Sequence, residues 1–281
     1  PYTMVDEQTK DPNSSFNPPP QPKIGLALGG GVARGFAHIG FIRAMEKHGI
    51  KPTIVAGTSI GALVGASYIT GKLDILEQWA LSLNRRRIFS YLDLRIRSAG
   101  LIGGKKLESL LNEHFGDILI EDLPVPFIAI ATDMLTGHEV WIRKGRLVDA
   151  LQASFALPGV FPPVQMNQRF LLDGALVNPV PVSTLQAMGA RISIAVDLNA
   201  DLIGKASKPG QNFQTALGFD PLDDPDATPA DKKRLFSIFG KHIFRREDNS
   251  PSLFGVMVSA LNIIQDRLTR SRLAGDPPDI H

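Results

Sequence analysis

The stretch "IVAGTSIGALVGAS" (Ile54–Ser67) places one serine, Ser59, between two glycines where the local pattern changes. The β-branched residues before the serine are typical of a buried strand, and the small and aliphatic residues after it follow helical spacing. A strand, a sharp turn and a helix around G-x-S-x-G form a nucleophile elbow, in which Gly57 and Gly61 let neighbouring backbone approach closely. In the alternative interpretation, Ser59 only caps the helix.

The same alternation of strand and helix continues on both sides of this stretch. Apolar runs that end in glycine, aspartate or asparagine predict further buried strands at 23–30, 125–133, 169–173 and 190–199. This order predicts an α/β protein with a three-layer α/β/α fold and a mainly parallel central sheet. A helix at 147–157 is predicted to stop at Pro158, and a final helix has Val258, Leu261, Ile264 (or Ile263) and Leu268 along one face.

Composition limits the possible classes of protein. A chain of 281 residues with 43% hydrophobic residues can form one large domain, and a net charge of +2 is too small to imply nucleic-acid binding. The absence of cysteine excludes disulfides, thiolate metal sites and a cysteine nucleophile. No apolar run approaches the roughly 20 residues that span a bilayer. We therefore expect a cytoplasmic protein, with peripheral contact at the inner face of the membrane as an open alternative.

Two segments depart from the globular pattern. Residues 1–22 are polar and proline-rich and lack the features of a signal peptide, which predicts a disordered leader. The globular pattern of strands and helices occupies 23–281, interrupted at about 200–252 by a segment rich in Asp, Pro, Gly and Lys. A segment of this length and composition predicts a mobile or inserted region.

A glycine-rich turn precedes the first predicted helix in "LALGGGVARGFAHIG" (26–40). The backbone N–H groups of Gly29, Gly30 and Gly31 are unobstructed by side chains, which suits binding of an anion. The phosphate-loop pattern fails because Phe36 follows Gly35, and the dinucleotide pattern fails because Arg34 stands where its last glycine belongs. The remaining interpretations are an oxyanion hole and a tight turn that only packs the helix on the sheet.

A serine nucleophile also needs a base. Among the six histidines only His242 fits, loosely, the order in which a conventional triad histidine follows its acid, and His38 is predicted to serve packing or hydrogen bonding. Asp173 follows an apolar strand and precedes a glycine, so its carboxylate is predicted at the C-terminal edge of the sheet, where open α/β folds place their sites. Asp133 has a similar position. Each aspartate can equally be a turn former.

The three elements "GGGVARG" (29–35), "GTSIG" (57–61) and "DGA" (173–175) occur in this order. Together they resemble the patatin-like phospholipase family, most closely its bacterial branch related to neuropathy target esterase, over about 23–197 and in the final helix. The resemblance implies a catalytic dyad without histidine, in which Ser59 is the nucleophile and Asp173 the general base. It further implies an oxyanion hole shaped by Gly29, Gly30, Gly31 and Arg34. This glycine loop is one residue longer than the compact G-G-G-x-R-G form, and Asp-Gly-Ala replaces Asp-Gly-Gly.

The implied activity is hydrolysis of lipid acyl esters, such as phospholipids or lysophospholipids, through an acyl-enzyme and without metal or cofactor. For Asp173 to act as a base, we expect burial to raise its pKa. The alternatives are an acyltransferase with the same dyad and a non-catalytic, membrane-associated regulatory module. Apolar and basic residues alternate at helical spacing in "DKKRLFSIFGKHIFRR" (231–246), and 232–246 is predicted either to contact an anionic membrane or to pack on the domain.

Overall fold

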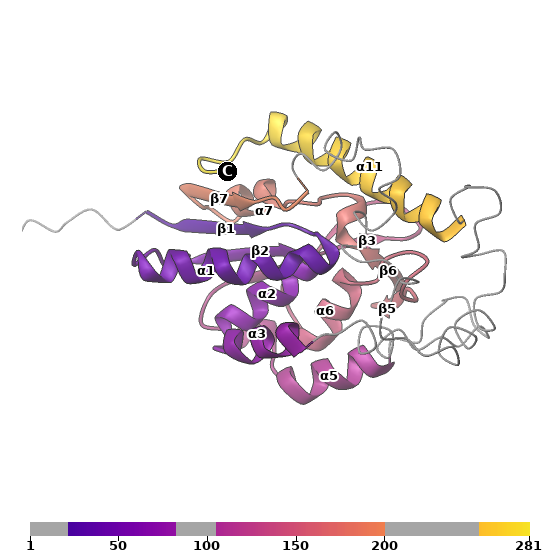
Figure 1. The fold of residues 1–281 in the computed structure, drawn as a ribbon, viewed down its shortest axis with the longest axis horizontal. Helices are drawn as coiled ribbons and strands as arrows, with labels where there is room; N and C mark the ends of the chain where they lie inside the picture. The colour runs from indigo at the N-terminus through magenta and orange to yellow at the C-terminus, as the bar shows by residue number, and fades with distance from the viewer. Residues whose placement is uncertain (1–21, 83–104, 200–252) are drawn as a thin grey trace, which may run out of the picture.

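A computed structural model describes residues 22–82, 105–199 and 253–281 (Figure 1). Seven strands form one sheet in the order β5-β6-β3-β2-β1-β7, and β4 also pairs with β3. The strands are β1 (Ile24–Leu28), β2 (Ile54–Thr58), β3 (Phe127–Asp133), β4 (Glu139–Ile142), β5 (Val164–Met166), β6 (Arg169–Asp173) and β7 (Ile192–Val196).

Helices lie on both faces of this sheet (Figure 1). The α-helices are α1 (Ala37–Lys47), α2 (Ile60–Ile69), α3 (Leu73–Ser82), α5 (Lys105–Phe115), α6 (Leu147–Ser154), α7 (Val182–Ala187) and α11 (Leu253–Gly275), with short 3₁₀ turns η1 (Val32–Phe36), η2 (Ile120–Asp122) and η3 (Gly174–Leu176). The pairs β7–β1, β1–β2 and β2–β3 are parallel, whereas β4, β5 and β6 join through antiparallel pairs. The predicted three-layer fold with a mostly parallel sheet is confirmed.

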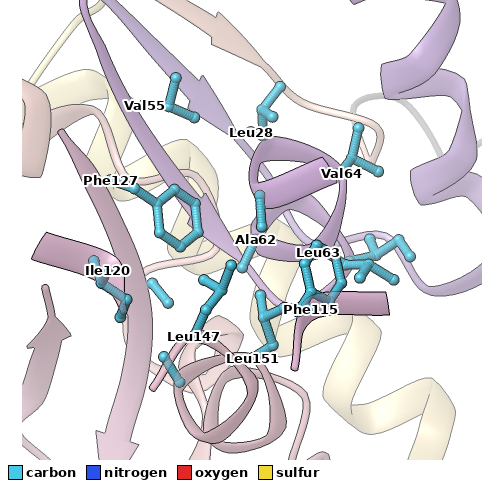
Figure 2. Close-up of a cluster of buried hydrophobic side chains, with 14 of the residues drawn as sticks. Leu28, Val55, Ala62, Leu63, Val64, Phe115, Ile120, Phe127, Leu147 and Leu151 are labelled. Carbon is cyan, nitrogen blue, oxygen red and sulfur yellow. The ribbon is translucent and has the colours of Figure 1, made fainter. Parts of the chain in front are cut away.

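Two cores follow from the alternation of side chains along the central strands. On one face, Leu28, Val55 and Phe127 pack with α1, α2, α3, α5 and α6, and Figure 2 shows these strand side chains directed at helix residues such as Leu63 and Leu151. On the other face, alanine and isoleucine residues of β1, β2, β3 and β7 pack against α7, and α11 lies over the same layer. The central strands β1, β2 and β3 are therefore buried on both faces, as expected for a parallel sheet, and the edge strand β7 contributes to both cores.

The register of β3 brings two distant segments together. One edge of β3 pairs with β4 over Ala129–Thr132. The other edge is shared, because Thr58 at the end of β2 pairs with Ile130 and Asp173 at the end of β6 pairs with the next residue, Ala131. The ends of β2 and β6 therefore lie next to each other beside β3. This brings Ser59 and Asp173 together, although 114 positions separate them in the sequence.

The final helix does not bury the apolar face that its sequence suggests. Ile263 and Ile264 are half exposed, whereas Gln265, Asp266 and Thr269 are buried. Helix α6 ends at Ser154, before Pro158 is reached. Within the described ranges, no helix combines the length and apolar character needed to cross a membrane. Residues 1–21, the predicted mobile segment 200–252, the basic segment 232–246 within it, and His242 lie outside the described residues.

Candidate active site

The turn between β2 and α2 holds Ser59 in a conformation that L-residues rarely adopt, with φ 55° and ψ −124°. The flanking glycines are required by close packing. A Cβ on Gly57 would lie 2.5 Å from the backbone of Ala62, and a Cβ on Gly61 would lie 2.1 Å from the carbonyl oxygen of Leu28. The strand–turn–helix around G-x-S-x-G thus has the tight geometry of a nucleophile elbow.

The Ser59 hydroxyl points to a carboxylate and does not cap the helix. Its Oγ donates a hydrogen bond to Asp173 Oδ2 at 2.7 Å. Ser59 occupies the N-cap position of α2, but its side chain forms no capping hydrogen bond. The helix-cap interpretation of Ser59 is therefore wrong.

Asp173 is almost fully buried, with 2% of its surface exposed. Its Oδ1 accepts a hydrogen bond from the Ala175 N–H at 2.8 Å, so one carboxylate oxygen holds the turn into η3 while the other faces Ser59. Burial raises the pKa of Asp173 to about 6, and the hydrogen bonds from Ala175 and Ser59 oppose this rise more weakly. The carboxyl group is thus both a turn former and a buried group that titrates near neutrality.

Ser154, the last residue of α6, fixes the elbow from behind. The Ser59 N–H donates to Ser154 Oγ at 2.8 Å, and the Ser154 hydroxyl donates to the Ile130 carbonyl oxygen at 2.6 Å. Ser154 is fully buried. This relay satisfies the amide of the strained residue and ties it to the strand beside it. No motif in the sequence singled out Ser154.

The glycine loop after β1 lies against the same site, but two of its amides are already engaged. The Gly29 N–H donates to Val196 O at 3.1 Å, and the Gly30 N–H donates to Pro179 O at 3.0 Å. The Gly31 N–H donates to no backbone oxygen of the described residues. Of the three glycine amides, the one at Gly31 is therefore left to meet a ligand.

Two polar side chains hold the carbonyl oxygens of this loop. His38, fully buried on α1, donates from Nε2 to Gly29 O at 2.8 Å, and burial lowers its pKa to about 4, so the ring is neutral near pH 7. Asn199 Nδ2 donates to Gly30 O at 3.2 Å, and Arg34 Nη2 in turn donates to Asn199 Oδ1 at 3.0 Å. Arg34 thus supports the loop through Asn199.

A pocket of about 470 Å³, including solvent space at its mouth, opens above Ser59 and Asp173. Gly30 and Gly31 form part of its wall, and α11 contributes Gln265. The rest of the wall is mainly apolar and comes from the segment after α6: Phe155, Leu157, Val160 and Phe161. An apolar lining with few polar groups is typical of small-molecule sites.

The part of the chain that contains this site matches a known protein family. The family described as patatin-like phospholipase matches residues 26–185, which include the glycine loop, the elbow and Asp173. The chain belongs to the patatin-like phospholipase family. The family resemblance drawn from the three sequence motifs is therefore confirmed.

Relatives of this patatin-like chain are found in bacteria and animals. An uncharacterized NTE family protein of Mycobacterium tuberculosis is 41% identical over 185 residues, which are 66% of this chain and 51% of that protein. Neuropathy target esterase sws of Drosophila melanogaster is 34% identical over 184 residues, which are 63% of this chain and 13% of that protein. The match thus spans about half the length of the mycobacterial relative and 13% of the length of the fly relative. Among solved structures, VipD from Legionella pneumophila aligns with a TM-score of 0.35 and 16% identity, over 55% of this chain and 46% of that one.

The patatin-like chain uses its second strand-end aspartate differently. Asp133 Oδ1 accepts hydrogen bonds from the Leu135 N–H at 2.9 Å and the Thr136 N–H at 3.1 Å, and Asp133 Oδ2 lies 3.6 Å from Arg169. These backbone hydrogen bonds, that from Thr136 first, lower the pKa of Asp133. Asp133 is a turn residue of the β3–β4 hairpin, and the structure brings it no closer to Ser59 than that hairpin allows. Gln265 is the wall residue that sequence reasoning missed, because its helix was judged by apolar spacing.

Proposed function

We propose that this chain is a serine hydrolase of lipid acyl esters, in which Ser59 is the nucleophile and Asp173 the general base. The observation that carries the proposal is the 2.7 Å hydrogen bond from Ser59 Oγ to the buried carboxylate of Asp173, at the floor of an apolar pocket. A pKa of about 6 makes Asp173 a stronger base than an ordinary aspartate and leaves it mostly ionised at neutral pH. The family and the esterase name of the fly relative support the same reaction class.

In the first half of the reaction, Ser59 Oγ bonds to the ester carbonyl carbon and its proton passes to Asp173 Oδ2. The carbonyl electrons move to oxygen and form an oxyanion. We assign stabilisation of this oxyanion to the Gly31 N–H and to the positive N-terminal end of α2, which begins at Ile60. The C–O bond then breaks, the alcohol leaves with the proton from Asp173, and an acyl-enzyme remains.

In the second half, Asp173 takes a proton from a water molecule as that water attacks the acyl carbon. The bond from that carbon to Ser59 Oγ breaks, the proton returns to Ser59, and the fatty acid leaves. The wall formed by Phe155, Leu157 and Phe161 offers apolar surface to the acyl chain and favours a lipid over a polar ester. All steps use side-chain and backbone groups of this chain.

A fluorophosphonate probe followed by mass spectrometry tests the proposal directly. We expect covalent labelling on Ser59, no labelling of Ser59→Ala, and hydrolysis of acyl esters that Ser59→Ala lacks. The matched control is Ser67→Ala, which removes a buried hydroxyl from α2, the helix that follows Ser59, and it should be labelled normally. Folded protein that remains unlabelled, or Ser59→Ala protein that still hydrolyses esters, would overturn the proposal.

A further inference from the structure

Large apolar side chains are displayed to solvent at one end of the molecule. Leu135 in the β3–β4 turn is 89% exposed, its neighbour Met134 is 54% exposed, and Phe170 on β6 is 49% exposed. We call Met134, Leu135 and Phe170 the apolar tip. Single exposed apolar side chains are common on protein surfaces, but two adjacent exposed apolar side chains at a turn are an unusual arrangement.

The tip is held by an ordered backbone. The Met134 N–H donates to Phe170 O at 2.8 Å, which joins the two parts of the tip. Asp133 closes the turn beneath Leu135 through its hydrogen bonds from the Leu135 and Thr136 amides, and the Gly137 N–H donates to Asp133 O at 2.8 Å. The exposed side chains are therefore presented by a fixed turn, so little ordering entropy is lost when they meet a partner.

The tip is joined to the pocket through β6, which carries both Phe170 and the pocket residue Asp173. Phe170 and Asp173 lie on the same short strand, and three residues of strand span only about 10 Å. Their side chains point to opposite faces of β6, since their positions differ by an odd number. Because β6 runs antiparallel to β3 and its pairing ends at Asp133, Phe170 and the turn after Asp133 lie beyond the carboxyl end of β3. The parallel strand β2 ends on the same side of the molecule, at Ser59.

The charge around the tip is compatible with a phospholipid surface. In the turns 134–138 and 165–170 there is no acidic residue, and the preceding Asp133 is buried and paired with Arg169. The Arg169 side chain is 63% exposed, and His138 is exposed as well. An apolar projection with a basic neighbour and no exposed carboxylate can enter the acyl region while its arginine remains among the headgroup phosphates.

We propose that the apolar tip inserts into a lipid surface and docks the pocket mouth against it. The choice of a lipid surface over another apolar partner rests on the proposed function, because an enzyme that takes acyl chains from a membrane must bring its pocket to that membrane. The residues of the apolar tip lie outside the basic segment 232–246 in the sequence. Binding of the tip is driven by apolar burial, so it should not require anionic lipid.

Vesicle sedimentation of the full chain tests the proposal. The vesicles are pure phosphatidylcholine, and a second set contains one third phosphatidylglycerol. The test variant is Leu135→Ser, and the matched control is Leu81→Ser, at a leucine that is 82% exposed on a different element, α3. We expect Leu135→Ser to weaken binding to both vesicle types by about ten-fold, as loss of one buried leucine predicts, and Leu81→Ser to bind as the parent does.

A second measurement reports insertion itself. In Leu135→Trp, the emission of the new tryptophan should shift to the blue when phosphatidylcholine vesicles are added, and the shift should persist in 0.5 M NaCl, a salt concentration chosen to screen charges. Ser59→Ala protein should sediment like the parent, and Leu135→Ser should keep parental hydrolysis of a soluble short-chain ester. These two results separate failure of docking from failure of the proposed chemistry.

Three results would overturn the proposal. One is equal vesicle binding by Leu135→Ser and Leu81→Ser, and another is a Leu135→Trp emission that vesicles do not shift. The third is gel filtration in which the parent is a dimer and Leu135→Ser a monomer, because the tip would then bind a second copy of this chain.

Discussion

The turns after β1 and β2 are neighbours at one edge of the sheet, but they are stabilised in different ways. The turn after β2 is fixed by steric contact, with Gly57 and Gly61 against backbone atoms and a serine held at positive φ. The turn after β1 is fixed by hydrogen bonds, since His38 and Asn199 hold its carbonyl oxygens. The turn after β2, which we call the side-chain turn, therefore displays the Ser59 side chain. The turn after β1, which we call the main-chain turn, displays the backbone amide of Gly31.

The difference teaches which changes each turn should tolerate. The side-chain turn should be destabilised when volume is added at its glycines, and should lose activity when the carboxylate partner of its hydroxyl is lost. The main-chain turn should tolerate a small added side chain at Gly30, where a Cβ has more space, provided that its carbonyl oxygens keep their donors. The predictions below follow from this contrast, beginning with the largest expected effect.

Asp173→Asn should reduce the rate of ester hydrolysis by about 10³-fold or more, because the amide cannot accept the proton of Ser59.

The same change, Asp173→Asn, should stabilise the fold at neutral pH. The pKa of Asp173 is raised on folding, so its contribution to stability is largest below pH 4 and is lost as the pH rises through about 6. Thermal unfolding should show Asp173→Asn above the parent at pH 8, by an amount on the order of 2 kcal/mol, and close to it at pH 4.

The kcat/KM of the parent for ester hydrolysis should fall in acid with a midpoint near the pKa of Asp173, about 6. A flat rate from pH 7 to pH 4.5, or an Asp173→Asn protein that is less stable than the parent at pH 8, would contradict the assignment of the base.

Gly61→Ala and Gly30→Ala test the steric contrast between the two turns. The new Cβ at Gly61 would lie 2.1 Å from the Leu28 carbonyl oxygen, whereas at Gly30 it would lie 3.4 Å from Ala175 Cβ, which is ordinary contact. We expect Gly61→Ala to lower the free energy of unfolding by about 3 kcal/mol or more, and Gly30→Ala by less than about 1 kcal/mol. Urea denaturation followed by circular dichroism measures both. Equal losses would show that the two turns are packed alike.

Ser154→Ala should lower kcat about ten-fold with little change in KM. The substitution leaves the Ser59 N–H without its acceptor inside the protein, at a cost of about 1–3 kcal/mol, and releases the strained elbow. Steady-state kinetics on a soluble ester measures the effect, with Ser67→Ala as the control for loss of a buried hydroxyl. A Ser154→Ala enzyme that loses stability but keeps its parental kcat would show that Ser154 supports only the fold.

The order of elements could be predicted from the sequence because buried parallel strands are short apolar runs that end in glycine or aspartate. Asp173 follows such a run, as Ser59 does, and is therefore predicted at the carboxyl edge of the sheet. A run of this kind places a residue there only when its strand is parallel, whereas β6 is antiparallel to β3. The contact between Ser59 and Asp173 depends on β2 and β6 sharing one edge of β3, and strand registers of this kind are not encoded in local spacing.

Other features of the site depend on contacts that have no sequence pattern. Ser154 follows an ordinary helical stretch, and only its position behind the elbow gives it a role. The apolar spacing of α11 gave no sign of its buried polar side chains, among which Gln265 lines the pocket and Asp266 pairs with Arg270 at 3.1 Å. Three consecutive glycines marked the turn after β1 as a candidate anion site, but their sequence cannot tell which amides already donate to Val196 and Pro179.

His38→Phe should have the smallest effect among these variants, a decrease in kcat of about three- to ten-fold, because it removes the donor that holds Gly29 O and loosens the turn that carries Gly31. His38→Gln keeps an N–H donor at a similar reach and should restore most of kcat.

The pKa of His38 is lowered on folding, so its contribution to stability is complete above pH 6.5 and is lost as the pH falls toward 4. This pH dependence is opposite to that of Asp173. His38→Gln should therefore be less sensitive to acid than the parent in thermal unfolding between pH 6.5 and pH 4. Unchanged acid sensitivity with unchanged kcat in both variants would mean that the hydrogen bonds from His38 do not hold the main-chain turn.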